Sequence, residues 1–286
     1  ELFIPYVLLV ISIVFLKYFD NSLESVQMYH YRLIEYPWKG GDQLLLKYCC
    51  VASIIRVSPN IYPKLKNIGK IDLIKGYNNN WNIETFGISF IKNKTMNLVF
   101  ISTSNIDDVL TSLKLSRKET DYGMIHKGYI ERFHKTYTSI LSILNDNKYK
   151  FKDIKCYGHS LGGVMASLTG LFLSSELGYK CNVITFGSPR WGNEQVKNWV
   201  SLKSGILKMK NYINSADPIP QRPKSSKYVT IGTNIVSRID TGNDNVNHGI
   251  KVYREIVIGN LDKCSIKSRG HRFDEIISRS VLDLFS

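Results

Sequence analysis

The sequence predicts an α/β protein with a mostly parallel central sheet flanked by helices, and three observations point to it. Apolar runs of strand length recur in the second half of the chain, as at 181–186 and 206–213. Segments with apolar residues at helical spacing separate such runs, for example 161–177. This alternation is typical of a parallel sheet whose faces are covered by helices. The chain has 286 residues, 43% of them hydrophobic, enough for one large core.

The elements of the first half are predicted from changes in the hydrophobic pattern. Residues 22–56 show helical spacing in pieces, and 57–82 are expected to connect elements through one short strand. Alternating apolar residues, followed by a continuous apolar run at 96–102, predict a hairpin that leads into a buried strand. Two amphipathic helices are expected next, at 104–113 and at about 129–145.

The second half of the chain has a more regular alternation. We expect a helix at 161–177 and strands at 151–157, 181–186, 206–213 and 228–235. A polar stretch that contains Asp240 and Asp244 is predicted as a turn, and a helix-like segment begins at His248.

The charge and the cysteines exclude several classes of function. The formal net charge is +14, but the lysines are spread along the chain and no nucleic-acid-binding motif accompanies them. We therefore expect no nucleic acid as a partner, and an anionic lipid surface fits the basic balance better. Five cysteines, an odd number without CxxC spacing, predict neither a disulfide framework nor a zinc site.

The N-terminus holds the longest apolar run of the chain. Residues 2–16 are nearly all apolar and uncharged, and Lys17 ends the run. Such a run is shorter than the roughly 20 residues of a comfortable membrane span. Because the chain begins at Glu1 rather than Met, we interpret the run as a membrane anchor whose beginning is trimmed. Residues 1–20 are then an anchor that places the protein at a membrane, and 21–286 are a single domain. The alternative is a buried apolar segment of that domain.

Residues 158–163 (GHSLGG) lie between a predicted strand and a predicted helix. This is the G-x-S-x-G pattern of a nucleophile elbow, a strained turn that exposes a serine hydroxyl above the edge of a sheet. Side chains at Gly158 and Gly162 would collide with the backbone of that turn. The helix that begins at Leu161 directs free amide groups at the reacting oxygen. Ser160 is therefore the predicted nucleophile, and the alternative is a tight glycine-rich turn with a surface serine.

A serine nucleophile needs a base that is oriented by an acid. In α/β-hydrolases the triad has the chain order serine, acid, histidine. Only His248 and His271 follow Ser160, and each leaves room for an acid between the serine and the histidine. His248 is preferred because it comes after a polar loop and before a helix, whereas His271 lies in a basic stretch typical of a solvated surface. The histidine inside the elbow, His159, is expected to point away from the active centre.

Asp217 is the predicted acid. It follows the strand expected at 206–213 and precedes a rigid Pro-Ile-Pro turn. Functional side chains in parallel sheets gather just past the carboxyl ends of strands. The alternative for Asp217 is a residue that caps the next turn. The other acids between Ser160 and His248 have the pattern of helix-face charges or lie in the polar turn: Glu176, Glu194, Asp240 and Asp244.

With these residues the sequence resembles the class 3 (fungal-type) lipase family of α/β-hydrolases. The similar segments are 126–129 (HKGY), 158–163 (GHSLGG), 184–193 (ITFGSPRWGN), 214–220 (NSADPIP), and His248 with Tyr253 five residues on. They occur in the family's order, and the resemblance spans about residues 85–257. It implies an α/β-hydrolase fold and a catalytic triad of Ser160, Asp217 and His248.

One segment departs from the family pattern. Where the family usually has Arg-Gly-Ser or Arg-Gly-Thr before its lid, this chain has Ile101, Ser102 and Thr103. The resemblance implies that Thr103 and the backbone amide of Leu161 donate to the oxyanion. The helix expected at 104–113 would then be the amphipathic lid, and the alternative is a plain surface helix.

The leading hypothesis is a serine ester hydrolase that acts on lipid esters, either a triacylglycerol lipase or a phospholipase, with no metal and no cofactor. The competing hypothesis is a membrane-anchored, hydrolase-like protein that binds without catalysis. The altered residues Ile101 and Ser102 favour the second hypothesis, and the complete set of Ser160, Asp217 and His248 favours the first. Reaction of Ser160 with a fluorophosphonate distinguishes the two.

Overall fold

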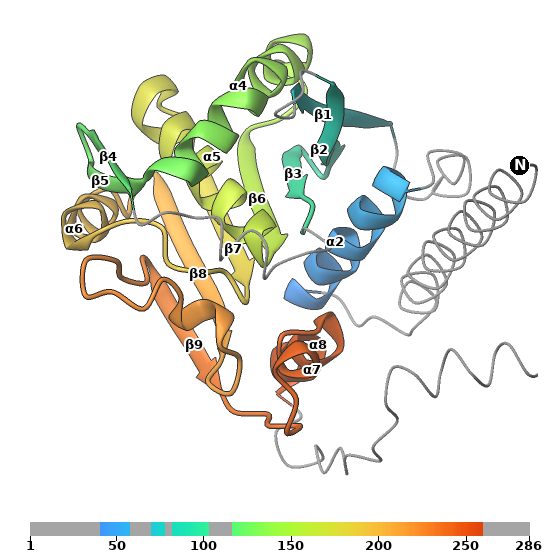
Figure 1. The fold of residues 1–286 in the computed structure, drawn as a ribbon. Coiled ribbons are helices and arrows are strands. Elements are labelled where there is room, and N and C mark those ends of the chain that lie inside the picture. Colours follow the sequence, from blue (N-terminus) through green and yellow to red (C-terminus); the bar gives the residue numbers. More distant parts are fainter. Residues whose placement is uncertain (1–40, 58–69, 78–81, 103–115, 260–286) are drawn as a thin grey trace, which may run out of the picture.

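One large sheet forms the centre of the described part of the protein. The computed structural model describes residues 41–57, 70–77, 82–102 and 116–259. The large sheet has seven strands in the order β1-β2-β3-β6-β7-β8-β9 (Figure 1). The first three pair antiparallel, and the strands from β3 to β9 pair parallel. Their bounds are β1 Ile71–Tyr77, β2 Ile83–Lys92, β3 Thr95–Phe100, β6 Asp153–His159, β7 Cys181–Phe186, β8 Leu207–Asn214 and β9 Thr233–Ser237.

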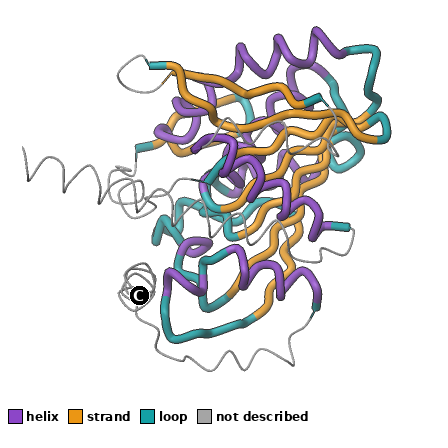
Figure 2. Tube along the Cα trace, turned by 90° about the vertical axis from the view of Figure 1, so that its right-hand side faces the viewer, coloured by secondary structure: helices purple, strands orange, loops and turns teal. Residues whose placement is uncertain are grey.

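Helices cover both faces of this sheet (Figures 1 and 2). One buried apolar cluster joins α4, α5 and α6 to the sheet, and a second joins α2 and α8 to its other face. Successive residues of a strand point to opposite faces, so Leu98 of β3 belongs to the first cluster and Val99 to the second. The helices are α2 Asp42–Val57, α4 Lys127–Asn147, α5 Leu161–Leu177, α6 Glu194–Leu202, α7 Asp244–Asn247 and α8 Ile250–Ile258.

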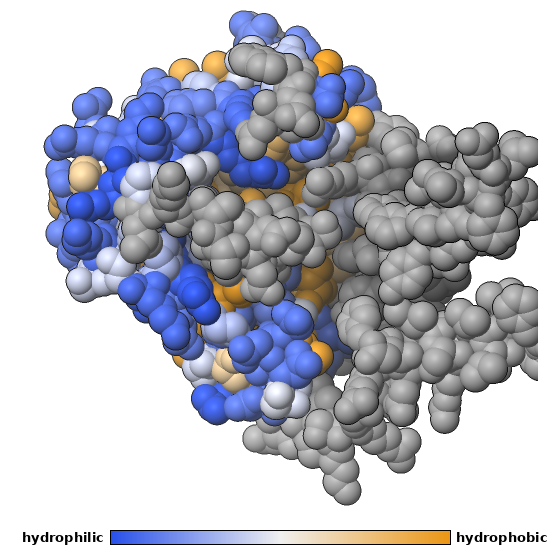
Figure 3. Space-filling model, in the orientation of Figure 1, coloured by the Kyte–Doolittle hydropathy of each residue, from blue (hydrophilic) through white to orange (hydrophobic). Residues whose placement is uncertain are grey.

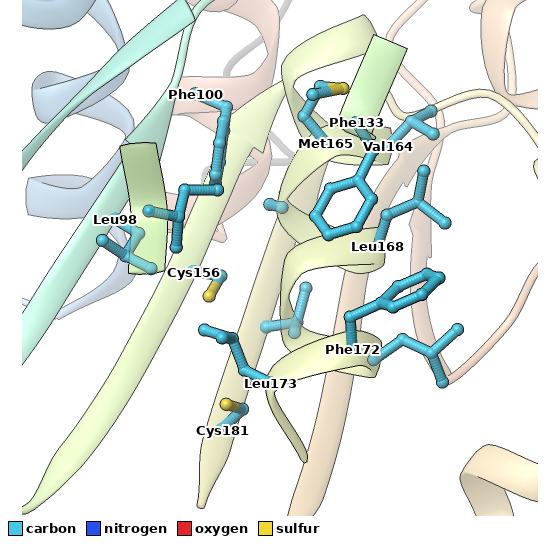
Figure 4. Close-up of a cluster of buried hydrophobic side chains, with 14 of the residues drawn as sticks. Leu98, Phe100, Phe133, Cys156, Val164, Met165, Leu168, Phe172, Leu173 and Cys181 are labelled. Atoms are coloured by element: carbon cyan, nitrogen blue, oxygen red, sulfur yellow. The ribbon is translucent and has the colours of Figure 1, made fainter. Parts of the chain in front are cut away.

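Helix α5 is the most deeply buried helix of the described residues. Every residue from Leu161 to Ser174 is buried, which is why its sequence is apolar or small on all sides. Figure 4 shows α5 beside the strands, with Leu173 close to Cys156 and Cys181. Both cysteines are buried free thiols.

The predicted fold class is confirmed. The structure has the mostly parallel sheet and the flanking helices, and α5 and β7 have the predicted bounds. The antiparallel hairpin of β2 and β3 leads into the parallel part through β6, as expected. A second, two-stranded sheet of β4 (Arg117–Thr120) and β5 (Gly123–His126) was not predicted. The strand β4 is polar and largely exposed, so it has no apolar pattern by which to recognise it.

Two predicted elements near the C-terminal side are wrong in detail. The strand expected at 228–235 is displaced: β9 begins at Thr233, and Val229 forms only an isolated bridge with Gly192. This strand lies at an edge of the sheet and is mostly exposed, so its sequence shows little alternation. The polar stretch expected as a turn contains the short helix α7, because Asn243 caps the amides of Asn245 and Val246.

Several predictions concern residues outside the described part of the chain. These are the segment 1–20 and its boundary with the domain, Thr103, the helix expected at 104–113, and His271. In the ranges that the structure does describe, no helix has the length and apolar character needed to cross a membrane.

Candidate active site

Ser160 occupies a strained turn between β6 and α5. Its backbone angles are φ 56° and ψ −129°, which residues other than glycine rarely adopt. Backbone hydrogen bonds hold the turn: Ser160 N donates to Phe186 O and Gly163 N donates to Ser160 O, each at 2.9 Å. The residue itself is 1% exposed. Strain that the surrounding structure maintains in this way is concentrated at functional sites.

The glycines on either side of Ser160 are required by the space available. A Cβ atom on Gly158 would overlap the backbone of Gly162, and one on Gly162 would lie 2.5 Å from the carbonyl oxygen of Phe100. Rotating a side chain relieves neither contact, since backbone atoms form both. The elbow therefore packs the start of α5 tightly against β3 and β6, which explains the glycine pattern seen in the sequence.

We expect Gly158→Ala to destabilise the protein by about 3 kcal/mol, because the added methyl group meets backbone that cannot move aside without distorting the elbow. Urea unfolding of the two proteins measures the difference. The matched control is Gly205→Ala, where a Cβ atom meets nothing within 4 Å. Equal loss of stability in both variants would contradict the steric explanation.

Asp217 and His248 form a buried pair just past the sheet. Asp217 follows β8, and His248 lies between α7 and α8. The distance from His248 Nδ1 to Asp217 Oδ2 is 2.6 Å. Asp217 is fully buried and His248 is 5% exposed. A buried carboxylate at this distance orients the imidazole and stabilises its protonated form.

Two further donors hold the carboxylate of Asp217. Tyr253 Oη donates to Oδ2 at 2.6 Å, and Ile219 N donates to Oδ1 at 2.8 Å. Burial, together with the charge of Asp217, raises the pKa of Tyr253, so its hydroxyl stays protonated and can donate. Tyr253 lies on α8, one turn beyond His248, and its spacing from the histidine was the only sequence signal for this contact.

The other ring nitrogen of His248 is available for chemistry. Donation from Nδ1 to Asp217 leaves Nε2 of the neutral ring as a proton acceptor. Nε2 is buried and has no hydrogen-bond partner among the described residues. A buried, oriented imidazole with one unused nitrogen can act as a general base.

His159 connects the elbow to the loop of His248. Its Nε2 lies 2.8 Å from the backbone oxygen of His248, and the two rings are 4.6 Å apart between centroids. The expectation that His159 points away from the active centre is therefore wrong. As the last residue of β6, it faces the loop that carries His248, and this contact brings the elbow of Ser160 next to the pair of Asp217 and His248.

In the described part of the chain, the side chains of the other candidate acids form no hydrogen bond or ion pair with a histidine side chain. Glu176 accepts a hydrogen bond from Tyr137, and Glu194 pairs with Lys197 on α6. Asp240 pairs with Arg238 at the surface, and Asp244 is in the first turn of α7.

Of the predicted oxyanion donors, Leu161 is the first residue of α5, next to Ser160, and Thr103 lies outside the described residues. The described residues include no group of three or more His, Cys, Asp or Glu that could hold a metal ion.

His126 is a buried histidine away from the pair. Its ring lies between those of Tyr129 and Tyr228, at 4.5 Å and 5.5 Å, and neither ring nitrogen has a hydrogen-bond partner among the described residues. Burial lowers the pKa of His126 below its usual value of 6.5. Because the unfolded chain binds this proton more readily, the stability that neutral His126 contributes is present above pH 6.5 and is lost as the pH falls below it.

We therefore expect His126→Phe to lose less stability than the natural protein when the pH falls from about 7.5 to about 5.5, a range that spans the ordinary histidine pKa. Phenylalanine keeps the ring contacts with Tyr129 and Tyr228 and has no proton to gain. Urea unfolding of both proteins at several pH values gives the comparison. A difference in unfolding free energy that does not change with pH would contradict the expectation.

The fold is that of the α/β-hydrolases. Residues 95–227 match the model of the family described as lipase (class 3). Among solved structures, lipase II from Rhizopus niveus has a TM-score of 0.56 and 20% identity, with 68% of this chain and 79% of that chain covered. The Lip2 lipase from Yarrowia lipolytica has a TM-score of 0.55 and 23% identity, with coverage of 70% and 78%. The match of residues 95–227 confirms the resemblance to the class 3 lipase family that the motifs predicted.

Two curated relatives match shorter segments. Secreted mono- and diacylglycerol lipase 1 of Fusarium solani is 27% identical over 124 residues, which are 42% of this chain and 36% of that protein. Secreted mono- and diacylglycerol lipase 2 of Gibberella zeae is 38% identical over 80 residues, 27% of this chain and 19% of that protein. The matched segments thus span little more than a third of the first relative and about a fifth of the second.

The localisation predicted from the sequence, membrane association through the N-terminal apolar segment, is wrong. No helix of the described residues can cross a membrane, and both of these lipase relatives are secreted. The prediction depended on a run of apolar residues that is shorter than a bilayer span. Hydropathy of so short a run does not distinguish an anchor from other apolar segments.

Proposed function

We propose that this protein is a serine ester hydrolase that acts on lipid esters, with Ser160, Asp217 and His248 as its catalytic triad. The observation that supports this most directly is the buried His248. Asp217 holds its Nδ1 at 2.6 Å, and its Nε2 has no partner among the described residues. Its ring lies 4.6 Å from that of His159, the residue that precedes the strained Ser160. A nucleophile, a base and an orienting acid are the set that ester hydrolysis requires.

In the proposed reaction, Ser160 Oγ attacks the ester carbonyl carbon while His248 Nε2 accepts the hydroxyl proton. The tetrahedral intermediate then expels the alcohol, which takes that proton from His248, and an acyl-serine remains. Water repeats the sequence, with His248 again as base, and releases the carboxylic acid. Asp217 stabilises the imidazolium throughout, held in turn by Tyr253 and Ile219 N.

The developing oxyanion needs donors that are in place before the reaction. The backbone amide of Leu161 is one proposed donor, because the start of α5 presents unpaired amides and the positive end of the helix dipole. Thr103 is the second proposed donor, by its position in the family resemblance.

A lipid ester substrate is supported by the relatives and by the surface. The two curated relatives reported above are named as mono- and diacylglycerol lipases, so glycerides are the proposed substrates in preference to phospholipids. In Figure 3 some apolar side chains are visible in the middle of the face shown, about where β6 and β7 end in Figure 1, with hydrophilic ones to their left. Apolar groups near these strand ends suit the acyl chains of such substrates.

A lipid panel tests the proposal. Triacyl-, diacyl- and monoacylglycerols and a phosphatidylcholine are presented to the protein at equal acyl concentration, and released fatty acid is titrated. We expect release from the glycerides and labelling of Ser160 by a fluorophosphonate. Faster release from phosphatidylcholine would replace the glyceride assignment by a phospholipase. Failure of both hydrolysis and labelling would favour the binding protein without catalysis.

A further inference from the structure

Two buried asparagines link the loop of the acid to the loop of the histidine. Asn214 ends β8, three residues before Asp217, and Asn247 directly precedes His248. Asn214 is fully buried and Asn247 is 2% exposed. A buried amide is costly unless its donors and acceptors are satisfied, so the partners of these two side chains show what they hold.

Asn214 uses both ends of its side-chain amide. Its Nδ2 donates to the backbone oxygens of Ile239 at 2.8 Å and of Asn247 at 3.0 Å. Its Oδ1 accepts from the backbone amides of Ile239 at 2.9 Å and of Ala216 at 3.3 Å. One side chain thus connects the end of β8 to both ends of the segment that leads to His248.

Asn247 makes the reciprocal connection. Its Nδ2 donates to the backbone oxygen of Ala216 at 3.2 Å and to Asp240 Oδ1 at 3.4 Å. Its Oδ1 accepts from Thr241 N and from Thr241 Oγ1, both at 2.8 Å. The acceptor end therefore binds within its own loop, and the donor end reaches the residue that precedes Asp217.

These bonds cross between the two loops. The backbone of Ala216, next to the acid, is held by both amides, and the backbone of Asn247, next to the histidine, is held by Asn214. We infer that Asn214 and Asn247 are positioning residues that set the 2.6 Å contact between Asp217 and His248. This inference rests on the proposed function. Neither side chain contacts the triad atoms in any bond described above, so they act through the backbone.

The magnitude of the effect follows from the geometry of catalysis. Asp217 and His248 belong to segments 31 residues apart in the chain, outside the strands and helices that flank them. Without the cross-links, the two loops would be joined at the pair mainly by its own contact and by the bonds of Tyr253 and His159, while Ile219 N holds the carboxylate only within its own loop. A displacement of about 1 Å in a catalytic arrangement can reduce the rate about 100-fold.

The test removes the link between the loops and keeps the link within one loop. Asn247→Asp retains the oxygen that accepts from Thr241 and loses the amino group that donates to Ala216. It is made in an Asp240→Asn background, because a carboxylate at 247 would otherwise face that of Asp240. The matched controls are Asp240→Asn alone and Thr241→Val. The second removes the hydroxyl that contacts Asn247 Oδ1 and Asn243 O inside the histidine loop and leaves the bridge to Ala216.

Three measurements separate positioning from stability. They are kcat and KM for 4-nitrophenyl butyrate, thermal unfolding, and the far-downfield proton NMR signal of the hydrogen between His248 Nδ1 and Asp217. We expect Asn247→Asp to lower kcat by about 10- to 100-fold, to leave KM unchanged, and to shift or broaden the NMR signal in a folded protein. Both controls should keep the kcat and the NMR signal of the natural protein.

The outcomes are decisive in each direction. A folded Asn247→Asp variant that keeps the natural kcat and NMR signal overturns the inference. If that variant does not fold, Asn214→Asp takes its place, since it keeps the acceptor of Ile239 N and Ala216 N and loses the two donated bonds. Failure of both variants to fold shows a structural role and also overturns it. If the natural protein hydrolyses no ester, the proposed function fails instead, while the NMR signal still reports on the asparagines.

Discussion

Replacement of Ser160 by alanine is expected to abolish ester hydrolysis and to leave the fold intact. The hydroxyl is the proposed nucleophile, and loss of a triad member typically lowers kcat by several orders of magnitude. The turn depends on Gly158, Gly162 and backbone hydrogen bonds, none of which involves the hydroxyl. Alanine at this position carries the same backbone strain as serine. Fatty-acid release, fluorophosphonate labelling and thermal unfolding provide the measurement.

The matched control for this prediction is Ser175→Ala. Ser175 lies on α5, the helix that Ser160 precedes, and its hydroxyl bonds to Tyr122 and to the backbone of Phe172. This variant should keep both activity and labelling. A folded Ser160→Ala protein that retained most of its hydrolysis would exclude the proposed mechanism.

Replacement of His248 by alanine is expected to be almost as damaging as loss of Ser160. Without the imidazole, no base of the described site accepts the proton of the nucleophile or returns it to the leaving alcohol. Asp217→Asn should also lower kcat strongly, by about 10⁴-fold in the best-studied triad, because the amide favours the wrong tautomer of the histidine. Both substitutions are expected to lower kcat, which is measured with a soluble ester. Thermal unfolding of the same variants shows whether they are folded.

Two other histidines serve as controls for His248. His134 is on the exposed side of α4, and its replacement by alanine should be close to neutral. His271→Ala should also be close to neutral, as its basic C-terminal surroundings indicate. If His271→Ala were inactive and His248→Ala active, the base would lie in the C-terminal tail and the site assignment would be wrong.

Local patterns were sufficient for most of the sheet. The buried strand β7 and the helix α5 are continuous apolar segments with clear ends, and their bounds were predicted correctly. The exposed strands β4 and β9 were missed or displaced, because a strand at the surface needs no apolar alternation. Where burial on the sheet did not shape the sequence, the sequence contained too little information to place an element.

The candidate site shows the same division between local and distant contacts. The elbow is a local motif, in which glycine is required because a larger side chain would collide with neighbouring backbone. The orientation of His159 was predicted wrongly because the variable position in G-x-S-x-G is not constrained by the turn. Its direction is set by the loop of His248, 89 residues further along the chain.

The sequence by itself determined the fold class, the resemblance to class 3 lipases, the serine turn and a short choice of acids and histidines, because each depends on local patterns and motifs. The tertiary structure supplied the 2.6 Å contact between the predicted Asp217 and His248, and it alone showed that Tyr253, Asn214 and Asn247 support the pair. The physical reason is that a hydrogen bond between distant segments forms only when its donor and acceptor lie within a few tenths of an ångström of the ideal distance. Those distances are fixed only when the folded sheet brings the loops at its edge together, and the order of residues along the chain does not show them.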